Sequence, residues 1–230
     1  MHVSIVHWLG FEFVDIRCEA NPDGELAAQA EDVFARCRGA LARFGLGFED
    51  NVRSRIWAAD RAAWTAASKT RFAVLSGTAR GASSSYIAPE RFMSPASIGL
   101  DLLAVRPRAG VAKVIKDFEP KRDAPPICYV TLGPLMVVSG MTAVLPTLED
   151  QVAGDILPRI SFYLAEAGSG WSRVARVSCY LHRSQSADAL RALFRRTVPA
   201  WPPQFEIVSV DGYSQDGKLV EIEVTAERAG

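Results

Sequence analysis

The feature of this chain that most constrains its fold is an internal repeat. Residues 29–45 predict a helix that ends at a glycine, and a glycine-rich turn and a strand at 52–57 follow it. Residues 151–168 begin the same series again, with a turn at 168–171 and a strand at 174–180. The offset of roughly 120 residues is too long for a solenoid repeat and suits two copies of a small domain. We therefore expect two similar domains in one chain.

Composition narrows the classes of function. The 26 acidic and 26 basic residues give no net charge, which argues against a nucleic-acid partner. The four cysteines show no Cys-x-x-Cys spacing and the three histidines form no metal-binding pattern, so we expect no metal and no cofactor. The first residues do not resemble a secretory signal, and no apolar run has membrane-spanning length. These observations predict a cytoplasmic protein with no membrane partner.

The periodicity of the apolar residues predicts the order ββαβαββ in the first half. The expected elements are strands near 3–7 and 11–15, a helix at 26–44, a strand at 52–58, a helix at 61–75, and strands at 82–87 and 97–105. The second half predicts strands at 128–132 and 135–139, a helix that opens near Thr147, a strand at 174–181, a helix at 186–196, and strands at 205–210 and 219–225. Because 106–126 is charged and contains prolines, we expect domains at 1–108 and 127–230 joined by a linker at 109–126.

The second long helix differs from the first in one respect. It is one residue longer between its glutamine and its glycine, and it contains Pro158. Proline removes a backbone donor and crowds the preceding turn, and an extra residue beside it favours a kink or a π-bulge. We therefore predict an irregular helix before Pro158.

The predicted elements define an α+β fold. Each half would be a mixed sheet with two helices that cover one face. The strand at 98–104 is too apolar for its other face to meet solvent, so another copy of the same domain is the expected cover. Such an assembly would be barrel-like, and it favours a homo-oligomer, with a trimer as the preferred state.

Three phrases in the second half resemble one known family. They are Val-Val-Ser-Gly-Met at 137–141, the turn at 168–171, and Lys-Leu-Val-Glu-Ile-Glu-Val-Thr-Ala at 218–226. In this order and spacing they resemble the RidA/YjgF family of reactive-intermediate deaminases. The first half resembles the same family more faintly, through the helix at 29–45 and Thr-Ala-Arg at 78–80. The chain thus looks like a tandem RidA-like protein with the chorismate-mutase-like domain fold, distantly similar to the two-part chorismatases.

The resemblance implies a site in a cleft between neighbouring domains. There, an arginine holds a substrate carboxylate and a glutamate moves protons during enamine or imine hydrolysis. The arginine position is Arg80 in the first half and falls near Pro202 in the second. The glutamate position is Glu221 in the second half and Gly99 in the first, where Asp101 follows on the same face. The resemblance therefore implies a composite site with Arg80 and Glu221 as the catalytic pair.

Further residues are implied to bind the substrate. Ser139 and Gly140 match the Ser-Gly pair whose backbone completes the family's cleft. Trp57 and Tyr86 could line an aromatic pocket, and Arg55, which shares a strand face with Arg53, could deepen a positive cleft.

Each of these residues also has an ordinary structural interpretation. Arg80 could pair with a surface acid, and Glu221 could lie on a solvated strand face. Ser139 and Gly140 could form only a bulge or a strand end. Trp57 and Tyr86 could be plain core, and the face with Arg55 could be exposed to solvent. The sequence leaves these alternatives open.

The leading functional prediction is a RidA-like deaminase, a hydrolase that acts on the enamine or imine of a small unsaturated carboxylate. Arg80 would bind the carboxylate through two parallel hydrogen bonds, and Glu221 would donate a proton. One alternative is a chorismatase-like enzyme that releases pyruvate from an enol ether, again by protonation from Glu221. Another is a non-catalytic protein that binds a ligand or stabilises a partner.

Overall fold

The structure is a computed structural model that describes residues 1–118 and 127–229. The first half contains β1 (His2–Trp8), β2 (Phe11–Glu19), α1 (Leu26–Ala42), β3 (Asn51–Ala58), α2 (Arg61–Val74), β4 (Ala82–Ile87) and β5 (Ile98–Val105). The second half contains β6 (Lys113–Lys116), β7 (Tyr129–Leu132), β8 (Leu135–Met141), a π-helix (Asp150–Ile156), α3 (Leu157–Glu166), β9 (Val174–His182), α4 (Ala187–Thr197), β10 (Gln204–Val210) and β11 (Val220–Glu227). The predicted element order of the first half is confirmed.

The two sheets share one topology. The first has the strand order β1-β2-β5-β3-β4, and the second has β10-β9-β11-β8-β7-β6. Without β6, the second order read backwards repeats the first, and β3–β4 and β9–β10 are the parallel pairs in both. The registers also match, because Trp57 lies opposite Gly99 and Tyr180 lies opposite Glu221. The internal repeat seen in the sequence is therefore a repeat of structure, and the predicted α+β class is confirmed.

The connection between the halves differs from the prediction. Residues 113–116, which the sequence placed in the linker, form β6 and pair antiparallel with β7. The strand covers the backbone edge of β7 that would otherwise be unpaired, and this accounts for its position. Residues 119–126 of the predicted linker lie outside the described residues.

The helix before Pro158 is irregular, as predicted. Residues 150–156 form a π-helix that continues directly into α3, whose first turn contains Pro158. The helix is continuous here, so Pro158 removes one N–H from the backbone ladder, and the π-helical turns before it are where the regular α-helical pattern is broken. Thr147 accepts a hydrogen bond from the Asp150 amide at 3.1 Å and so caps the start of the whole segment.

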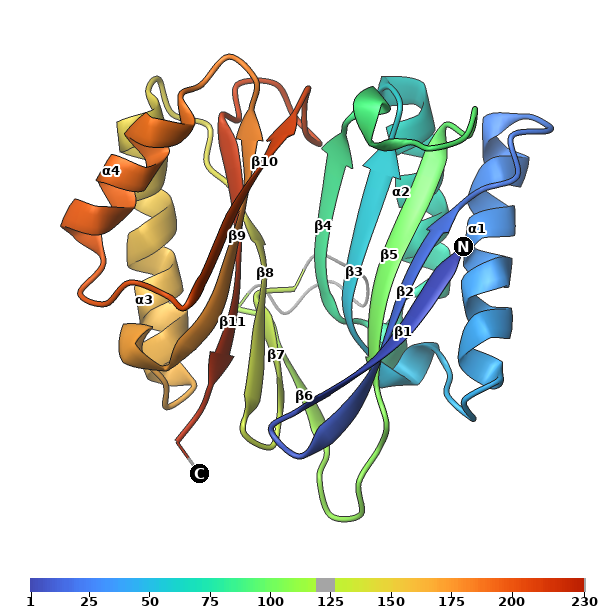
Figure 1. Ribbon diagram of the computed structural model, residues 1–230, viewed down its shortest axis with the longest axis horizontal. Coiled ribbons are helices and arrows are strands. Elements are labelled where there is room, and N and C mark those ends of the chain that lie inside the picture. The colour runs from blue at the N-terminus through green and yellow to red at the C-terminus, as the bar shows by residue number, and fades with distance from the viewer. Residues whose placement is uncertain (119–126, 230) are drawn as a thin grey trace.

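The sheets face each other, and the helices lie on their outer faces (Figure 1). Apolar side chains join the sheets at one end of the interface, namely Phe11, Phe13, Val52, Ala82, Val130, Leu135 and Val137. Aromatic side chains join them at the other end, namely Trp57, Tyr86, Tyr180 and Tyr213. Along β3, Arg53 and Arg55 lie between Val52 and Trp57, so charged groups occupy the middle of the interface. Among the described residues no helix is long and apolar enough to cross a membrane.

Candidate functional site

Two glutamates on β11 point into the interface between the halves. Val220, Ile222 and Val224 pack into the core under the helices of the second half. Because side chains alternate along a strand, Glu221 and Glu223 face the first half. Both are buried, with 5% and 4% of their surface exposed. The face of β11 that carries Glu221 could have been exposed to solvent on the sequence evidence, and it is buried.

Glu223 forms a buried ion pair with Arg55. The Arg55 Nε lies 2.9 Å from both carboxylate oxygens, and the hydroxyls of Ser84 and Tyr86 also donate to Glu223. Burial by itself would raise the pKa of Glu223, but the charges of Arg55 and Arg53 and these hydrogen bonds lower it to about 2. Glu223 is therefore a permanent anion, and Arg55 is its counter-ion.

The pKa of Glu221 is shifted in the opposite direction to that of Glu223. Burial raises its pKa to about 8, and the charge of Glu223 acts in the same direction, while Lys218 and Arg71 oppose the rise. A backbone hydrogen bond at Ser85 also favours the ionised form. Two carboxyl groups on one strand whose pKa values diverge in this way define a potential acid and a fixed charge. At neutral pH the Glu221 carboxyl therefore keeps its proton.

Ser139 and Gly140 form a bulge in β8 beside Glu221. Met141 lies opposite Ile222 and Val138 lies opposite Val224, so β8 has one more residue than β11 between these pairs. A Cβ atom on Gly140 would lie only 1.8 Å from the Glu221 Oε1. The glycine thus allows the carboxyl to lie directly against the β8 backbone. Bulges often re-aim side chains next to active sites, and this one places the Ser-Gly pair against the Glu221 carboxyl.

The free edge of β4 completes the surroundings of Glu221. The Ser83 amide donates to the Ser139 Oγ at 3.1 Å, and the Ile87 amide donates to the Gly212 carbonyl at 2.9 Å. The Ser85 amide lies between them in sequence and forms a backbone hydrogen bond with the Glu221 carboxyl. The second half thus satisfies alternate amides of an edge strand that would otherwise be unpaired. These bonds fix the acid at the boundary between the halves.

Trp57 and Tyr86 belong to an aromatic cluster between the sheets. The Tyr86 and Tyr180 rings stack with their centroids 3.9 Å apart, and the Trp57 ring lies 5.1 Å from Tyr86. Arg55 lies over Tyr180 at 5.5 Å, with its charge already used by Glu223. These three predicted binding residues therefore make contacts inside the protein, which is the ordinary interpretation of Trp57 and Tyr86.

Arg80 and Glu221 have different partners. The Arg80 Nε donates to the Gly77 carbonyl at 3.2 Å, and its Nη1 lies 4.0 Å from Asp117. The cations whose charges act on Glu221 are Lys218 and Arg71. Arg71 was not among the residues predicted from the sequence, although it follows the buried Ala63 and Ala67 of α2 at four-residue spacing. An arginine on the buried stripe of a helix was the signal that could have found it.

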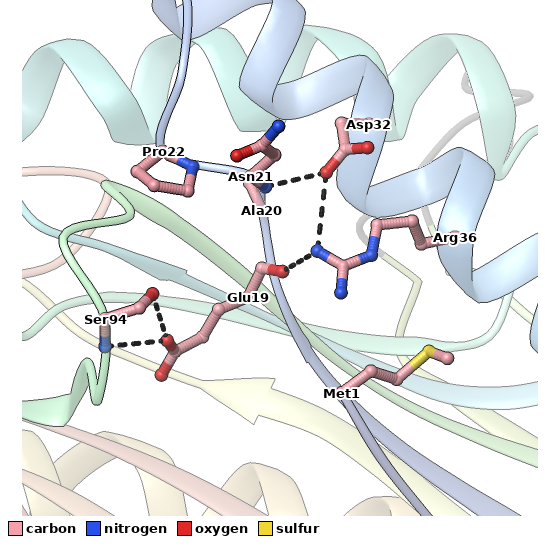
Figure 2. Close-up of a pocket in the computed structure, with 8 residues that line it drawn as sticks. All are labelled: Met1, Glu19, Ala20, Asn21, Pro22, Asp32, Arg36 and Ser94. Carbon is pink, nitrogen blue, oxygen red and sulfur yellow. Dashed lines mark hydrogen bonds and ion pairs between the residues drawn. The ribbon is translucent and has the colours of Figure 1, made fainter.

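Three cavities of substantial size have linings that do not include Glu221. One of them, of about 510 Å³, lies beside the end of β2 and α1. There, Ser94 donates to Glu19, and Arg36 pairs with Asp32 at 3.6 Å (Figure 2). Every residue that lines this cavity belongs to the first half, and its charged side chains already have partners, because Asp32 pairs with Arg36 and Glu19 accepts hydrogen bonds from Ser94. Across the described ranges, no group of three His, Cys, Asp or Glu side chains is arranged to hold a metal ion.

Comparisons with known proteins found similar folds among solved structures. No family model matches the sequence, and no curated protein matches it. A solved chorismatase matches with a TM-score of 0.66 at 15% identity, over 97% of this chain and 77% of that one. A YjgF/YER057c/UK114 family member from Mycobacterium tuberculosis (26% identity, TM-score 0.43) matches over 50% of this chain and 99% of its own. A YjgF family protein from Neisseria meningitidis (22% identity, TM-score 0.45) matches over 52% of this chain and 97% of its own.

The chorismatase match defines the class of fold. It extends over nearly the whole chain, so both halves and their mutual arrangement take part in it. This chain therefore has a chorismatase-like fold made of two similar halves, and the predicted tandem, chorismatase-related architecture is confirmed.

Proposed function

We propose that this protein hydrolyses the enamine or imine of a small unsaturated carboxylate at the boundary between its halves, with Glu221 as the proton donor. The observation that carries the proposal is the divergence of the two β11 carboxyls, since the pKa of Glu221 is raised to about 8 while that of Glu223 is lowered to about 2. General acids work best when their pKa lies near the operating pH.

The reaction can be written with 2-aminoacrylate as the enamine. The Glu221 carboxyl gives its proton to the terminal carbon of the C=C bond, and the nitrogen lone pair forms the C=N bond of an iminium ion. Water adds to the iminium carbon, and the resulting carbinolamine loses ammonia to leave pyruvate. A proton released by the added water restores Glu221. Ser139 and Gly140, which lie against the acid, would orient the reacting group.

A cation must hold the substrate carboxylate. The sequence resemblance selects Arg80, and Lys218 is a second candidate because its charge acts on Glu221. We expect the anchor's alanine variant to raise KM by about ten- to a hundredfold with kcat retained, since it removes binding common to the ground and transition states. Steady-state kinetics of Arg80→Ala and Lys218→Ala identify which residue it is. If neither variant changes KM, the anchoring role is wrong for both.

The principal test uses freshly generated 2-aminoacrylate and follows ammonia release above the spontaneous rate. Glu221→Gln keeps the size of the side chain and removes the acid, so we expect a loss of about a hundredfold or more in kcat. Glu227→Gln, on the exposed end of the same strand, is the matched control and keeps its rate. Full activity in Glu221→Gln, or no acceleration by the native protein, would refute the proposal.

A second candidate function is release of pyruvate from a cyclic enol ether. The full-length likeness to a chorismatase favours it. Protonation of the enol-ether carbon by Glu221 would be the shared step. Incubation with chorismate separates the two, because pyruvate from chorismate supports only this reaction, and ammonia from 2-aminoacrylate supports only the first.

A non-catalytic binding protein is the outcome if neither product is formed. In either case we propose a homo-oligomer, with the trimer preferred. Sedimentation equilibrium tests this assignment, and a mass of one chain at micromolar concentration would contradict it.

A further inference from the structure

A second cavity lies between the inner faces of the two sheets. It encloses about 320 Å³ and is lined by residues of both halves, among them Trp8, Phe13, Arg53, Leu135 and Arg176. We propose that it binds a small organic anion with an apolar body, an aromatic or cyclic carboxylate, between Arg53 and Arg176. This site is separate from the proposed acid site and does not depend on its function.

The two arginines occupy equivalent positions in the repeat. Arg53 lies on β3 opposite Leu103, and Arg176 lies on β9 opposite Thr225. In each half the arginine lies four residues before the aromatic residue that faces Gly99 or Glu221. Each half therefore contributes one guanidinium to the same cavity, where the two can contact an anion from opposite sides.

Only one of these arginines has a carboxylate partner of its own. Arg176 is bonded to Glu206 and Ser178. The registers of the parallel pairs make Ser84 the first-half equivalent of Glu206, so Arg53 lacks the corresponding acid. Within the described residues, the Arg53 guanidinium has no hydrogen-bond partner and no carboxylate within 4.0 Å.

The remaining charges leave an excess of one cation. Glu223 is already held by Arg55, and Asp15, which lines the cavity, lies 3.6 Å from Arg17. Burial lowers the pKa of Arg53, the charges of Arg55 and Arg176 lower it further, and the charge of Glu223 opposes them. Arg53 is half-buried, and a cation that is partly removed from water without a hydrogen-bonded anion carries a desolvation cost that a bound carboxylate would offset.

The shape and lining of the cavity specify the rest of the ligand. Trp8, Phe13, Leu103 and Leu135 supply apolar walls, and Gln204 and His7 add polar edges. The volume of about 320 Å³ is at the small end of ligand pockets, which suits a single ring with one or two carboxylates. Along β11, Glu223 lies between Glu221 and Thr225, so the Arg55–Glu223 pair separates this cavity from the acid.

Calorimetric titration of the full chain tests the proposal. The probes are benzoate, cinnamate and cyclohexanecarboxylate, with benzamide as the uncharged control. We expect at least one carboxylate to bind with one-to-one stoichiometry and benzamide to bind about tenfold more weakly or not at all. If the ligand quenches tryptophan fluorescence in the native protein but not in Trp8→Phe, it is located in this cavity.

Variants complete the test. Arg53→Met should weaken carboxylate binding about ten- to a hundredfold, and Arg53→Lys should weaken it less. The exposed Arg43→Met is the matched control and should bind as the native protein does, as should Glu221→Gln. Equal binding by Arg53→Met, equal binding of benzamide, or no binding of any carboxylate up to about 10 mM would overturn the proposal. Arg53→Lys supplies the result if Arg53→Met fails to fold.

Discussion

The two halves differ most at one equivalent position. In the first half Gly99 lies opposite Trp57, and it lines a cavity of about 300 Å³ together with that ring. In the second half Glu221 lies opposite Tyr180 and fills the corresponding place with a carboxyl. The same topology thus holds empty space on one side and a buried acid on the other. The same backbone therefore accommodates a glycine in one copy and a buried carboxyl in the other.

The next equivalent position sharpens the contrast. Asp101 in the first half corresponds to Glu223 in the second, but its Oδ2 accepts from the Trp57 Nε1 at 2.9 Å, and Arg91 is 3.8 Å away. Burial raises the pKa of Asp101, whereas Arg55 holds the pKa of Glu223 low. Arg55 belongs to the first half and neutralises the acid of the second. The asymmetry is therefore maintained by contacts between the halves.

The largest expected effect comes from breaking that contact. Arg55→Met leaves Glu223 buried without its counter-ion, so we expect a loss of about 3–5 kcal/mol in the free energy of unfolding at neutral pH. Urea denaturation measures it. The control is Arg176→Met, whose pair with Glu206 is 34% and 39% exposed and should be worth less than about 1 kcal/mol. Equal losses in both variants would show that the buried Arg55–Glu223 pair contributes no more to stability than a partly exposed pair.

Glycine variants test how closely the acid is packed. Gly140→Ala would place a Cβ against the Glu221 carboxyl, and we expect a loss of about 1–3 kcal/mol in stability. Gly99→Ala meets its nearest atoms at 3.4–3.5 Å, an ordinary contact, and should change stability by less than about 0.5 kcal/mol. Thermal denaturation of both variants compares the two positions directly. A tolerated Gly140→Ala would mean that the acid can move away from β8.

The raised pKa of Glu221 predicts a pH-dependent stability. Between its ordinary value near 4.5 and its folded value of about 8, the unfolded chain has lost this proton while the folded chain keeps it. Rising pH therefore favours unfolding, by up to about 1.4 kcal/mol per pH unit, and the effect levels off above about pH 8. Glu223 is ionised in both states over this window.

Urea titrations of the native protein and Glu221→Gln at about pH 5.5 and 7.5 measure this effect. The difference in free energy of unfolding between them should shift in favour of the variant as the pH rises. A pH-independent difference would mean that Glu221 is ionised throughout this range.

The sequence predicted what depends on neighbours along the chain. The apolar periodicity defined the order of the elements, and the extra residue before Pro158 indicated the π-helix. Strand β6 was missed because four residues with lysine at both ends carry little periodicity. Local patterns of this kind need no knowledge of the partner strand.

What the sequence could not supply was the pairing of charges across the interface. Arg55 and Glu223 form an ion pair only because β3 and β11 face each other. The charge of Arg71, which lies on α2, likewise acts on Glu221 from a distant part of the chain. Nothing within a few residues of Arg55 indicates an acid so far along the chain. The state of a buried carboxyl depends on such distant partners, and so its pKa requires the structure.

The smallest expected effect compares the two long helices. Gly39 in α1 and Gly154 in the π-helix are both exposed, and neither would bring a Cβ within 4 Å of another atom. Gly39→Ala should stabilise the protein by about 0.5–1 kcal/mol, because alanine loses less backbone entropy in an α-helix. Helix propensities describe the α-helix, so we expect a smaller gain from Gly154→Ala. Equal gains in urea denaturation would mean that the π-helical geometry does not alter the preference for alanine, and that the two helices differ only in length.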